Sequence, residues 1–384
     1  MAILKKHLER DSLMKLVNGR ENSFVIKEDK MLSIYTTENI VTSIFQDSDN
    51  RYDAWYDFIT KLRPTMNVLL NEDTDYEEND YNPVYMFEKD YDIDIEPEFL
   101  DEVGENAYLS LVMSLAPDVI NDPHAIFLLD IDESQAKIIS EKYGVICHSF
   151  NSSPSSNPIF QEGIEKNVEK KEKGRGWHEL LPVDAVSPSN SLVFVDRYLF
   201  SKDSDGITGQ DGINNAYEVL NRILPAKLGV DYHILFVFDA STLSIHSGDT
   251  FENIAKQLNK LVVRLARPYN IIMESVSIDH NDMNYDETHN RRILSNYFIV
   301  RVDRSLKAFR PTHSLYSQSM FLDWGASKGI IHSKRSDVPA KALGKYIKEV
   351  KIAIGQLKKS VGQVPFAKNG EILPIKDISH RFIC

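Results

Sequence analysis

Hydrophobic and polar positions follow two rhythms along the chain, and together they predict alternating strands and helices. Continuous apolar runs of four or five residues, such as 192–195 and 234–238, have the length of buried strands. Other segments repeat their apolar residues every three or four positions, which is typical of a helix with one buried face. No run approaches the ~20 apolar residues that a membrane helix needs. The pattern therefore predicts an α/β protein.

The clearest unit lies in residues 124–149. The run AIFLLDI from Ala125 predicts a buried strand, DESQAKIISEKYG predicts a helix that Gly144 stops, and VICHSF predicts a second strand. This order forms a βαβ unit of a parallel sheet. Asp130 and Asp132 follow the first strand, where ligands of α/β proteins often bind, but no Gly-rich phosphate loop accompanies them.

The second half of the chain repeats this alternation. We expect strand, helix, strand, helix and strand, in this order, over residues 191–200, 211–224, 231–240, 249–267 and 270–278. Two further strands follow in ILSNYFIVRVDRSL, with Ser295-Asn296 as the turn between them. Near the end of the sequence, an apolar stripe from Val338 to Leu357 with lysines opposite predicts a long basic helix.

Composition places a domain boundary in the middle of the chain. Residues 151–176 are rich in Ser, Asn and Pro and then in mixed charges, as linkers are. We therefore expect two domains, an acidic α/β domain over 1–150 and a second α/β domain over 177–384. Residues 71–80, NEDTDYEEND, predict a solvated acidic loop, because their six carboxylates repel each other and no basic residue accompanies them. They lack the glycine and the ligand spacing of an EF-hand, which argues against calcium binding. A mimic of nucleic-acid charge is the alternative interpretation of this loop.

The net charge of −13 is distributed unevenly. Residues 1–150 carry 13 basic and 31 acidic residues, and residues 151–290 carry 13 and 20. Residues 291–384 carry 18 and 6, a net charge of +12. We expect the basic C-terminal region to attract nucleic acid and the acidic half to offer a surface to a protein partner. The alternative is that the two parts neutralise each other within one fold or oligomer.

Two features of the sequence indicate the cellular compartment of the protein. The only cysteines, Cys147 and Cys384, are far apart in sequence, which favours neither a disulfide scaffold nor a thiolate metal cluster. The first ten residues, MAILKKHLER, carry charges where a signal peptide needs an apolar core. We therefore expect a cytoplasmic protein without a membrane span.

One short segment, THNRRILSNY from Thr288, carries candidate chemistry. In a strand, His289 and Arg291 project from the same side. An imidazole can attack phosphorus or transfer a proton, and a guanidinium binds two phosphate oxygens at once. The pair therefore predicts a phosphate-directed site in which His289 and Arg291 are the candidate catalytic residues.

Around this pair the sequence resembles the phospholipase D-like superfamily. It looks most like the branch with a single His-x-Arg motif, which is related to the C-terminal domain of MIT-domain (microtubule-interacting and trafficking) proteins. The resemblance covers residues 190–310, and it is carried by the strand SLVFVDRYLF with Asp196, the helix ending in Ile223-Leu224-Pro225, and His289-Asn290-Arg291. It implies an α/β/α sandwich for the C-terminal domain. In active members, one histidine attacks the phosphodiester and a second protonates the leaving group.

The chain departs from the superfamily pattern at several positions. Arg291 stands where a lysine is expected, and the following aspartate is absent, since Asn296 lies five residues beyond Arg291. A second candidate motif, His332-Ser333-Lys334, lacks the downstream Asp and Gly-Ser. A site with two histidines would therefore require a homodimer. The MIT-linked branch is understood as a binding module that lost catalysis, so the resemblance implies phosphate or lipid-headgroup binding as well as hydrolysis.

Other residues complete the predicted site. Asp196 and Arg197 close the first strand of the second half, and we expect them either to line a cleft beside His289 or to form an ion pair that braces the sheet. The lysines of residues 341–359 add electrostatic attraction for a nucleic-acid backbone. Four residues are predicted to bind phosphate or nucleic acid, namely Arg292, Asn296, Arg301 and Arg304.

The leading hypothesis is a phosphodiester-directed effector, a metal-independent nuclease that needs no cofactor. An organisation of one acidic and one basic part in two domains would suit a bacterial defence or mobile-element protein, although no single residue points to that role. One alternative is a non-catalytic interaction subunit with a degenerate fold that binds protein or anionic partners, where His289 and Arg291 pair with nearby carboxylates. The other is a metal-dependent nuclease, whose divalent ion would be held by Asp279, His280, Asp282, Asp286 and His289.

Overall fold

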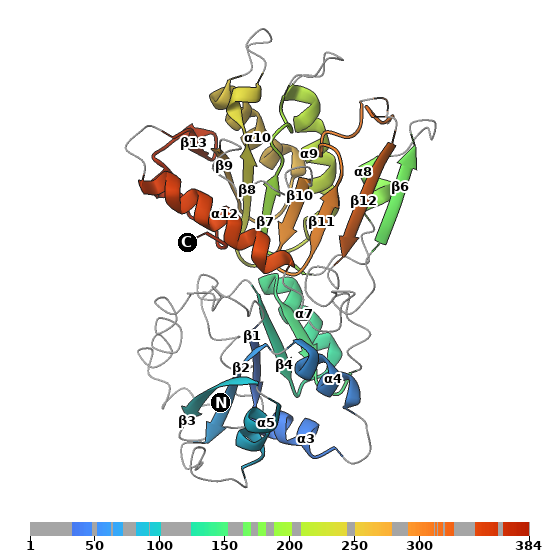
Figure 1. The fold of residues 1–384 in the computed structure, drawn as a ribbon, viewed down its shortest axis with the longest axis vertical. Coiled ribbons are helices and arrows are strands. Elements are labelled where there is room, and N and C mark those ends of the chain that lie inside the picture. The colour runs from blue at the N-terminus through green and yellow to red at the C-terminus, as the bar shows by residue number, and fades with distance from the viewer. Residues whose placement is uncertain are drawn as a thin grey trace. The chain divides into compact units, whose positions relative to one another are not determined.

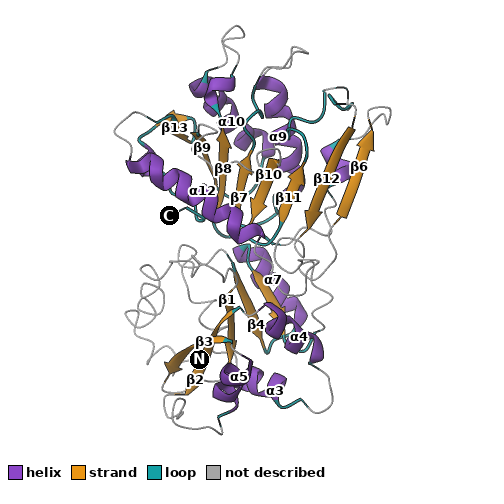
Figure 2. Cartoon of the chain, in the orientation of Figure 1, coloured by secondary structure: helices purple, strands orange, loops and turns teal. Residues whose placement is uncertain are grey.

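A computed structural model of the chain confirms the α/β class, because helices alternate with strands in two β-sheets (Figure 2). Within the described part of the chain, no helix combines the length and the apolar character needed to cross a membrane. The structure describes residues 33–47, 52–62, 64–71, 82–91, 93–100, 124–152, 164–169, 176–181, 188–201, 209–243, 250–278, 291–310, 312, 314–317, 319–325, 342–359 and 364–383.

The chain divides into two compact units. The first takes in Met1–Ser140, Val145–Asn157 and Ser333–Gly344, and the second takes in Glu141–Gly144, Pro158–His332 and Lys345–Cys384. Residues 333–344, which the sequence placed in the C-terminal domain, are thus grouped with the N-terminal unit. Each unit contains one of the two sheets, and we describe them separately.

The N-terminal unit contains a five-stranded parallel sheet in the order β3-β2-β1-β4-β5. The predicted βαβ unit is confirmed, since β4 and β5 are parallel neighbours joined by α7. Gly144 ends this helix with a φ of 65°, a left-handed conformation that glycine adopts without strain. The elements are β1 (Ser33–Thr37), α3 (Glu38–Phe45), α4 (Asp53–Leu62), β2 (Thr65–Asn71), α5 (Pro83–Tyr91), β3 (Asp94–Leu100), β4 (Ala125–Leu129), α7 (Glu133–Tyr143) and β5 (Ile146–Ser149).

The C-terminal unit contains a nine-stranded sheet in the order β14-β13-β9-β8-β7-β10-β11-β12-β6. Strands β7, β8 and β9 are parallel, whereas β10, β11 and β12 pair antiparallel. The predicted strands and helices of this half are confirmed, including the hairpin at Ser295-Asn296. The strands are β6 (Ile164–Glu169), β7 (Ser191–Val195), β8 (Tyr232–Phe238), β9 (Ile271–Ser277), β10 (Arg291–Ser295), β11 (Ile299–Val302), β12 (Ser319–Gly325), β13 (Phe366–Lys368) and β14 (Glu371–Ile372).

Helices lie on both faces of this second sheet (Figure 1). On one face, α9 and α10 connect the parallel strands, and Phe238 at the end of β8 stacks on Phe251 of α10 with the ring centroids 5.6 Å apart. On the other face, α12 crosses nearer the amino ends of β7 and β8. The helices are α8 (Trp177–Leu180), α9 (Gly209–Ile223), η5 (Ala240–Thr242), α10 (Phe251–Leu265), α12 (Ala342–Lys359) and η7 (Ile375–Asp377).

One strand lies where the sequence predicted a linker. Residues 164–169 form β6, an edge strand that pairs antiparallel with β12. Val168 is fully buried, but Glu165, Asn167 and Glu169 are exposed, so the segment reads as a charged linker in the sequence. An edge strand with charged, outward-facing side chains is a common protection against further strand pairing. Residues 72–80 of the acidic segment and Val338 lie outside the described residues.

Candidate functional site at the carboxyl edge of the C-terminal sheet

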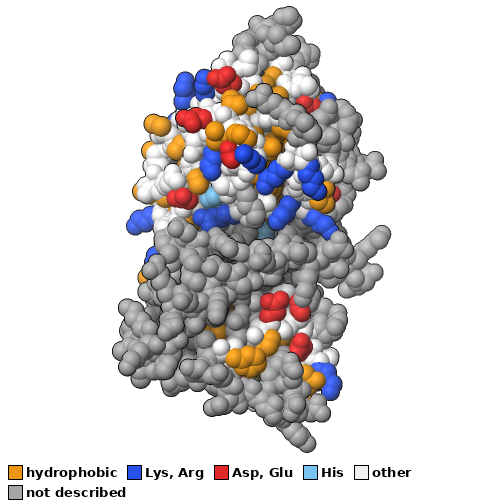
Figure 3. Space-filling model, turned by 90° about the vertical axis from the view of Figure 1, so that its left-hand side faces the viewer, with side chains coloured by type: hydrophobic (Ala, Val, Ile, Leu, Met, Phe, Trp, Pro, Cys, Tyr) orange, Lys and Arg blue, Asp and Glu red, His pale blue; other side chains and the backbone are white. Residues whose placement is uncertain are grey.

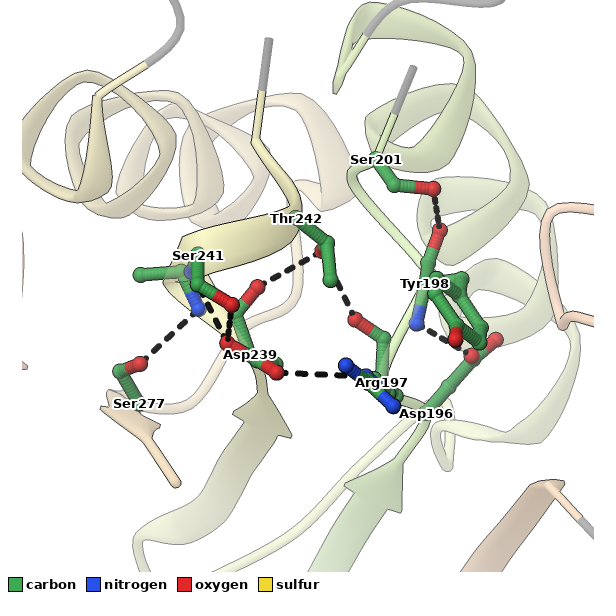
Figure 4. Close-up of polar contacts among 9 residues, drawn as sticks. Asp196, Arg197, Tyr198, Ser201, Asp239, Ser241, Thr242 and Ser277 are labelled. Carbon is green, nitrogen blue, oxygen red and sulfur yellow. Dashed lines mark hydrogen bonds and ion pairs between the residues drawn. The ribbon is translucent and has the colours of Figure 1, made fainter. Parts of the chain in front are cut away.

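Polar side chains gather where the parallel strands of the C-terminal unit end. Asp196 and Arg197 follow β7, Asp239 follows β8, and Arg291 begins β10, which pairs with β7 on its other side. Strand β7 therefore lies at the topological switch point, with β8 and β9 to one side and β10 to the other. Ligands of open α/β sheets bind at this position. We call Asp196, Arg197, Tyr198, Asp239 and Arg291 the carboxyl-edge cluster, much of which is drawn in Figure 4.

Asp196 is the buried anchor of the cluster. Its side chain has no exposed surface, and its Oδ2 accepts hydrogen bonds from Ser305 Oγ at 2.7 Å and from the Leu306 backbone N–H at 2.6 Å. Its Oδ1 accepts from the Tyr198 backbone N–H at 2.9 Å. Burial raises the pKa of Asp196, and the hydrogen bond from Ser305 and the charge of Arg291 oppose that shift. Asp196 thus ties the end of β7 to the segment that follows β11.

Arg291 is brought to this carboxylate by the pairing of β10 with β7. Arg292 lies opposite Val195, so the preceding residue, Arg291, falls beside Asp196. The Nε of Arg291 lies 3.9 Å from Asp196 Oδ1, and its side chain is 13% exposed. A guanidinium that is partly exposed and oriented by a buried carboxylate keeps a fixed position from which it can bind a phosphate.

A second arginine is held by the neighbouring strand. Arg197 Nε lies 3.2 Å from Asp239 Oδ2, and the arginine side chain is 26% exposed (Figure 4). The other oxygen of Asp239 accepts from the backbone N–H and the hydroxyl of Ser241, at 2.9 and 2.6 Å. Thr242 Oγ1 donates to the Arg197 carbonyl at 3.2 Å. These contacts hold the first residues after β7 and β8 against each other. The contact between Arg197 and Asp239 is an ion pair, which matches the bracing role that the sequence analysis gave as one alternative for Arg197.

Tyr198 lies beside both arginines. Its ring centroid is 5.0 Å from the Cζ of Arg197 and 5.7 Å from the Cζ of Arg291, which are distances of cation–π contacts. The residue is 37% exposed, so one part of the ring faces solvent. Sequence reasoning named Tyr198 only as part of the segment Asp196-Arg197-Tyr198, without a role of its own, and it missed Asp239. The position of Asp239 after the apolar run of β8 was the available signal, because it matches that of Asp196 after β7.

Two residues that the sequence assigned to phosphate binding have structural positions instead. Arg292 is 6% exposed and lies on the opposite face of β10 from Arg291, where its Nη1 is 3.5 Å from Glu349 of α12. Asn296 is fully buried, and its Oδ1 accepts from the backbone N–H groups of Asn190 and Ser191 at 2.9 and 3.1 Å. These side chains stabilise the layers of the unit, and neither presents a surface to a ligand. We correct both assignments for that reason.

The other predicted phosphate ligands lie away from the cluster. Arg301 of β11 donates from Nη2 to Asp323 of β12 at 3.0 Å and is 30% exposed. The side chain of Arg304 is 63% exposed, with its Nε 3.9 Å from the neighbouring Asp303. Neither residue has a contact with the carboxyl-edge cluster among those that the structure records. They remain candidates for a wider binding surface.

Lysines of α12 form a separate basic feature. Lys348, Lys351, Lys358 and Lys359 have partly or fully exposed side chains. From the side of Figure 1 on which α12 ends, Lys and Arg side chains gather in a band across the C-terminal unit (Figure 3). Because α12 covers the other face of the sheet from Arg291, these lysines do not line the carboxyl-edge cluster. Lys341 and the side chain of Lys345 lie outside the described part.

The candidate nucleophile and the candidate metal ligands fall outside the described residues. Segment 279–290 contains His289 and the acidic loop before it, and residues 326–341 contain His332 and Lys334. The structure fixes the two ends of the first segment, because β9 ends at Ser277 and β10 begins at Arg291. Among the residues that are described, no group of three or more His, Cys, Asp or Glu side chains is arranged to hold a metal ion.

Comparison with known proteins finds no protein-family model that matches the chain. No curated protein matches it either. The function is therefore argued from the geometry of the carboxyl-edge cluster.

Proposed function

We propose that the chain binds and cleaves phosphodiesters at the carboxyl-edge cluster, in the manner of the phospholipase D-like proteins that it resembles. The observation that carries the proposal is the position of Arg291. It stands at the switch point of the sheet, is oriented by buried Asp196, and lies two residues after His289 in the sequence. The expected substrate is nucleic acid, and the proposal includes a homodimer, because one chain supplies a single convincing histidine motif.

The cluster supplies the electrostatic part of such a reaction. Arg291 and Arg197 bring two guanidiniums to one edge, where they would bind the non-bridging oxygens of a phosphodiester. His289 would attack phosphorus, so that a P–N bond forms while the P–O bond to the leaving group breaks. The histidine of the second copy would protonate the leaving oxygen, and water would then release the phosphate from His289.

The direct test is cleavage of labelled DNA and RNA, with and without EDTA. We predict cleavage that EDTA does not affect and that His289→Ala lowers by at least roughly 10²–10⁴-fold, the usual contribution of a proton-transfer residue, because the variant loses the nucleophile as well as the acid. His178→Ala is the matched control, because this histidine is 54% exposed on α8, and it should retain full activity. Sedimentation in the same buffer should give a dimer. Cleavage that EDTA abolishes would instead favour the metal site of Asp279–Asp286.

A non-catalytic binding module is the second candidate, and one observation favours it. Each of the five arginines named above already has a carboxylate partner: Arg291 has Asp196, Arg197 has Asp239, Arg301 has Asp323, Arg292 has Glu349 and Arg304 has Asp303. Ion pairs of this kind also brace sheets that have no ligand. This candidate predicts that no nucleic acid is cleaved under any condition and that His289→Ala leaves partner binding unchanged.

A further inference from the structure

We propose that Tyr198 is a stacking platform for a nucleobase, so that the ligand of the carboxyl-edge cluster is a single nucleic-acid strand. This inference rests on the proposed function, because it specifies the ligand class for the same site. It adds a residue that neither the motif nor the resemblance indicated.

The ring of Tyr198 is exposed in a place where most large side chains are buried. The two residues that follow it, Leu199 and Phe200, are at most 2% exposed, whereas Tyr198 is 37% exposed. Arg197 approaches the ring from the end of β7, and Arg291 approaches it from the start of β10. Two guanidiniums, one just after β7 and one at the start of β10, therefore lie within cation–π distance of one partly exposed aromatic ring.

The backbone of Tyr198 is fixed before any ligand arrives. Its N–H donates to Asp196 Oδ1 at 2.9 Å, and its carbonyl accepts from the hydroxyl and the backbone N–H of Ser201 at 2.9 and 3.1 Å (Figure 4). Buried Lys307 donates in turn to the Ser201 carbonyl. A ring carried on such a turn loses little conformational entropy when a base stacks on it.

The combination suits a nucleotide better than a lipid headgroup. Both ligands offer a phosphate to Arg197 and Arg291, but only the nucleotide offers a flat base for the exposed ring. A single Arg–Tyr pair is ordinary in this fold. Arg264 lies 3.6 Å from the ring centroid of Tyr217, on helices α10 and α9. What distinguishes Tyr198 is a second guanidinium and its position at the switch point of the sheet.

The experiment compares two labelled probes on the full chain by fluorescence anisotropy. One probe is an oligothymidylate of about eight nucleotides, within the range that one strand-binding module covers, and the other is an abasic phosphodiester of the same length. We expect the wild type to prefer the oligothymidylate. Tyr198→Leu should lower the affinity for the oligothymidylate by about 5- to 150-fold, the range of base–aromatic stacking, and leave the affinity for the abasic probe unchanged.

Two control variants make the result decisive. Tyr198→Phe keeps the ring and should retain the preference for bases. Tyr217→Leu removes the comparison ring and should change neither affinity. Equal wild-type affinity for the two probes, or an equal loss of both in Tyr198→Leu, would overturn the platform and leave the phosphate site standing. Binding to phosphatidic acid vesicles in place of both oligomers would assign the ring to a lipid, and no binding of any probe would overturn the proposed function itself.

Discussion

Two adjacent arginines show how strand geometry separates residues that look alike in sequence. Arg291 and Arg292 both begin β10, and side chains of a strand alternate between its faces. Arg291 therefore lies beside Asp196, whereas Arg292 pairs with Glu349 beneath α12. The sequence assigned both to a ligand because a charged pair carries no sign of which member is covered. Of the two, Arg291 is the one that the proposed phosphate site can use.

Asn296 yields a stability prediction at the same scale. Asn296→Ala removes the acceptor of two buried backbone N–H groups, those of Asn190 and Ser191, and each uncompensated group costs about 1–3 kcal/mol. We expect urea denaturation to give a loss of roughly 2–4 kcal/mol in the free energy of unfolding. Asn214→Ala is the control, because among the described residues its amide oxygen makes only long, exposed contacts, with Gln210 of α9 and Arg264 of α10, and it should cost under about 0.5 kcal/mol. Equal losses in the two variants would contradict the structural role of Asn296.

At the scale of elements, the sequence predicted what depends on local pattern and missed what depends on distant partners. The strands of the C-terminal sheet were predictable because β7 and β8 are buried on both faces and therefore read as continuous apolar runs. Strand β6 was not predictable from the sequence, because Val168 is the one buried side chain recorded in it. Nor was the role of Asn296, whose partner Asn190 is 106 positions away. Three of the five residues of the carboxyl-edge cluster were predicted as site residues, namely Asp196, Arg197 and Arg291.

The C-terminal segment illustrates such long-range contacts. His380 is fully buried, and its Nε2 lies 3.0 Å from the Leu192 carbonyl of β7. The ring of His233 on β8 is 6.0 Å away, centroid to centroid. Glu274 of β9 is buried nearby and accepts from the Ser379 backbone N–H at 2.8 Å. Burial lowers the pKa of His380 to about 4, and burial together with the charge of His380 lowers that of His233 to about 3.

These histidines predict a pH dependence of stability. Between pH 6.5 and the folded values, the unfolded chain binds protons that the folded chain does not, so stability falls as the pH is lowered through this window. Burial raises the pKa of Glu274, which acts in the opposite direction above about pH 4.5. Comparing the wild type with His233→Gln isolates the histidine. Between pH 6 and 5, the free energy of unfolding should fall less steeply in the variant than in the wild type, by up to about 1.4 kcal/mol per pH unit. Parallel stability curves would contradict this assignment.

At the scale of the whole molecule, the candidate chemistry belongs to one of the two units. The carboxyl-edge cluster lies entirely within the unit that contains residues 158–332. The surplus of basic residues in 291–384 favours association of this part with an anion, and the acidic residues of 1–150 oppose it. We therefore predict binding that depends on salt and that is specified by a few residues at the switch point.

Equilibrium binding of a short labelled single-stranded oligonucleotide to the full chain, in EDTA and over a series of salt concentrations, tests this claim most directly. Arg291→Gln should weaken binding by about 10- to 100-fold and lower the salt dependence by roughly one released ion. Arg264→Gln, an exposed arginine at the far end of α10, should leave both quantities nearly unchanged. Equal binding by wild type and Arg291→Gln, with melting temperatures that show both to be folded, would contradict the phosphate site.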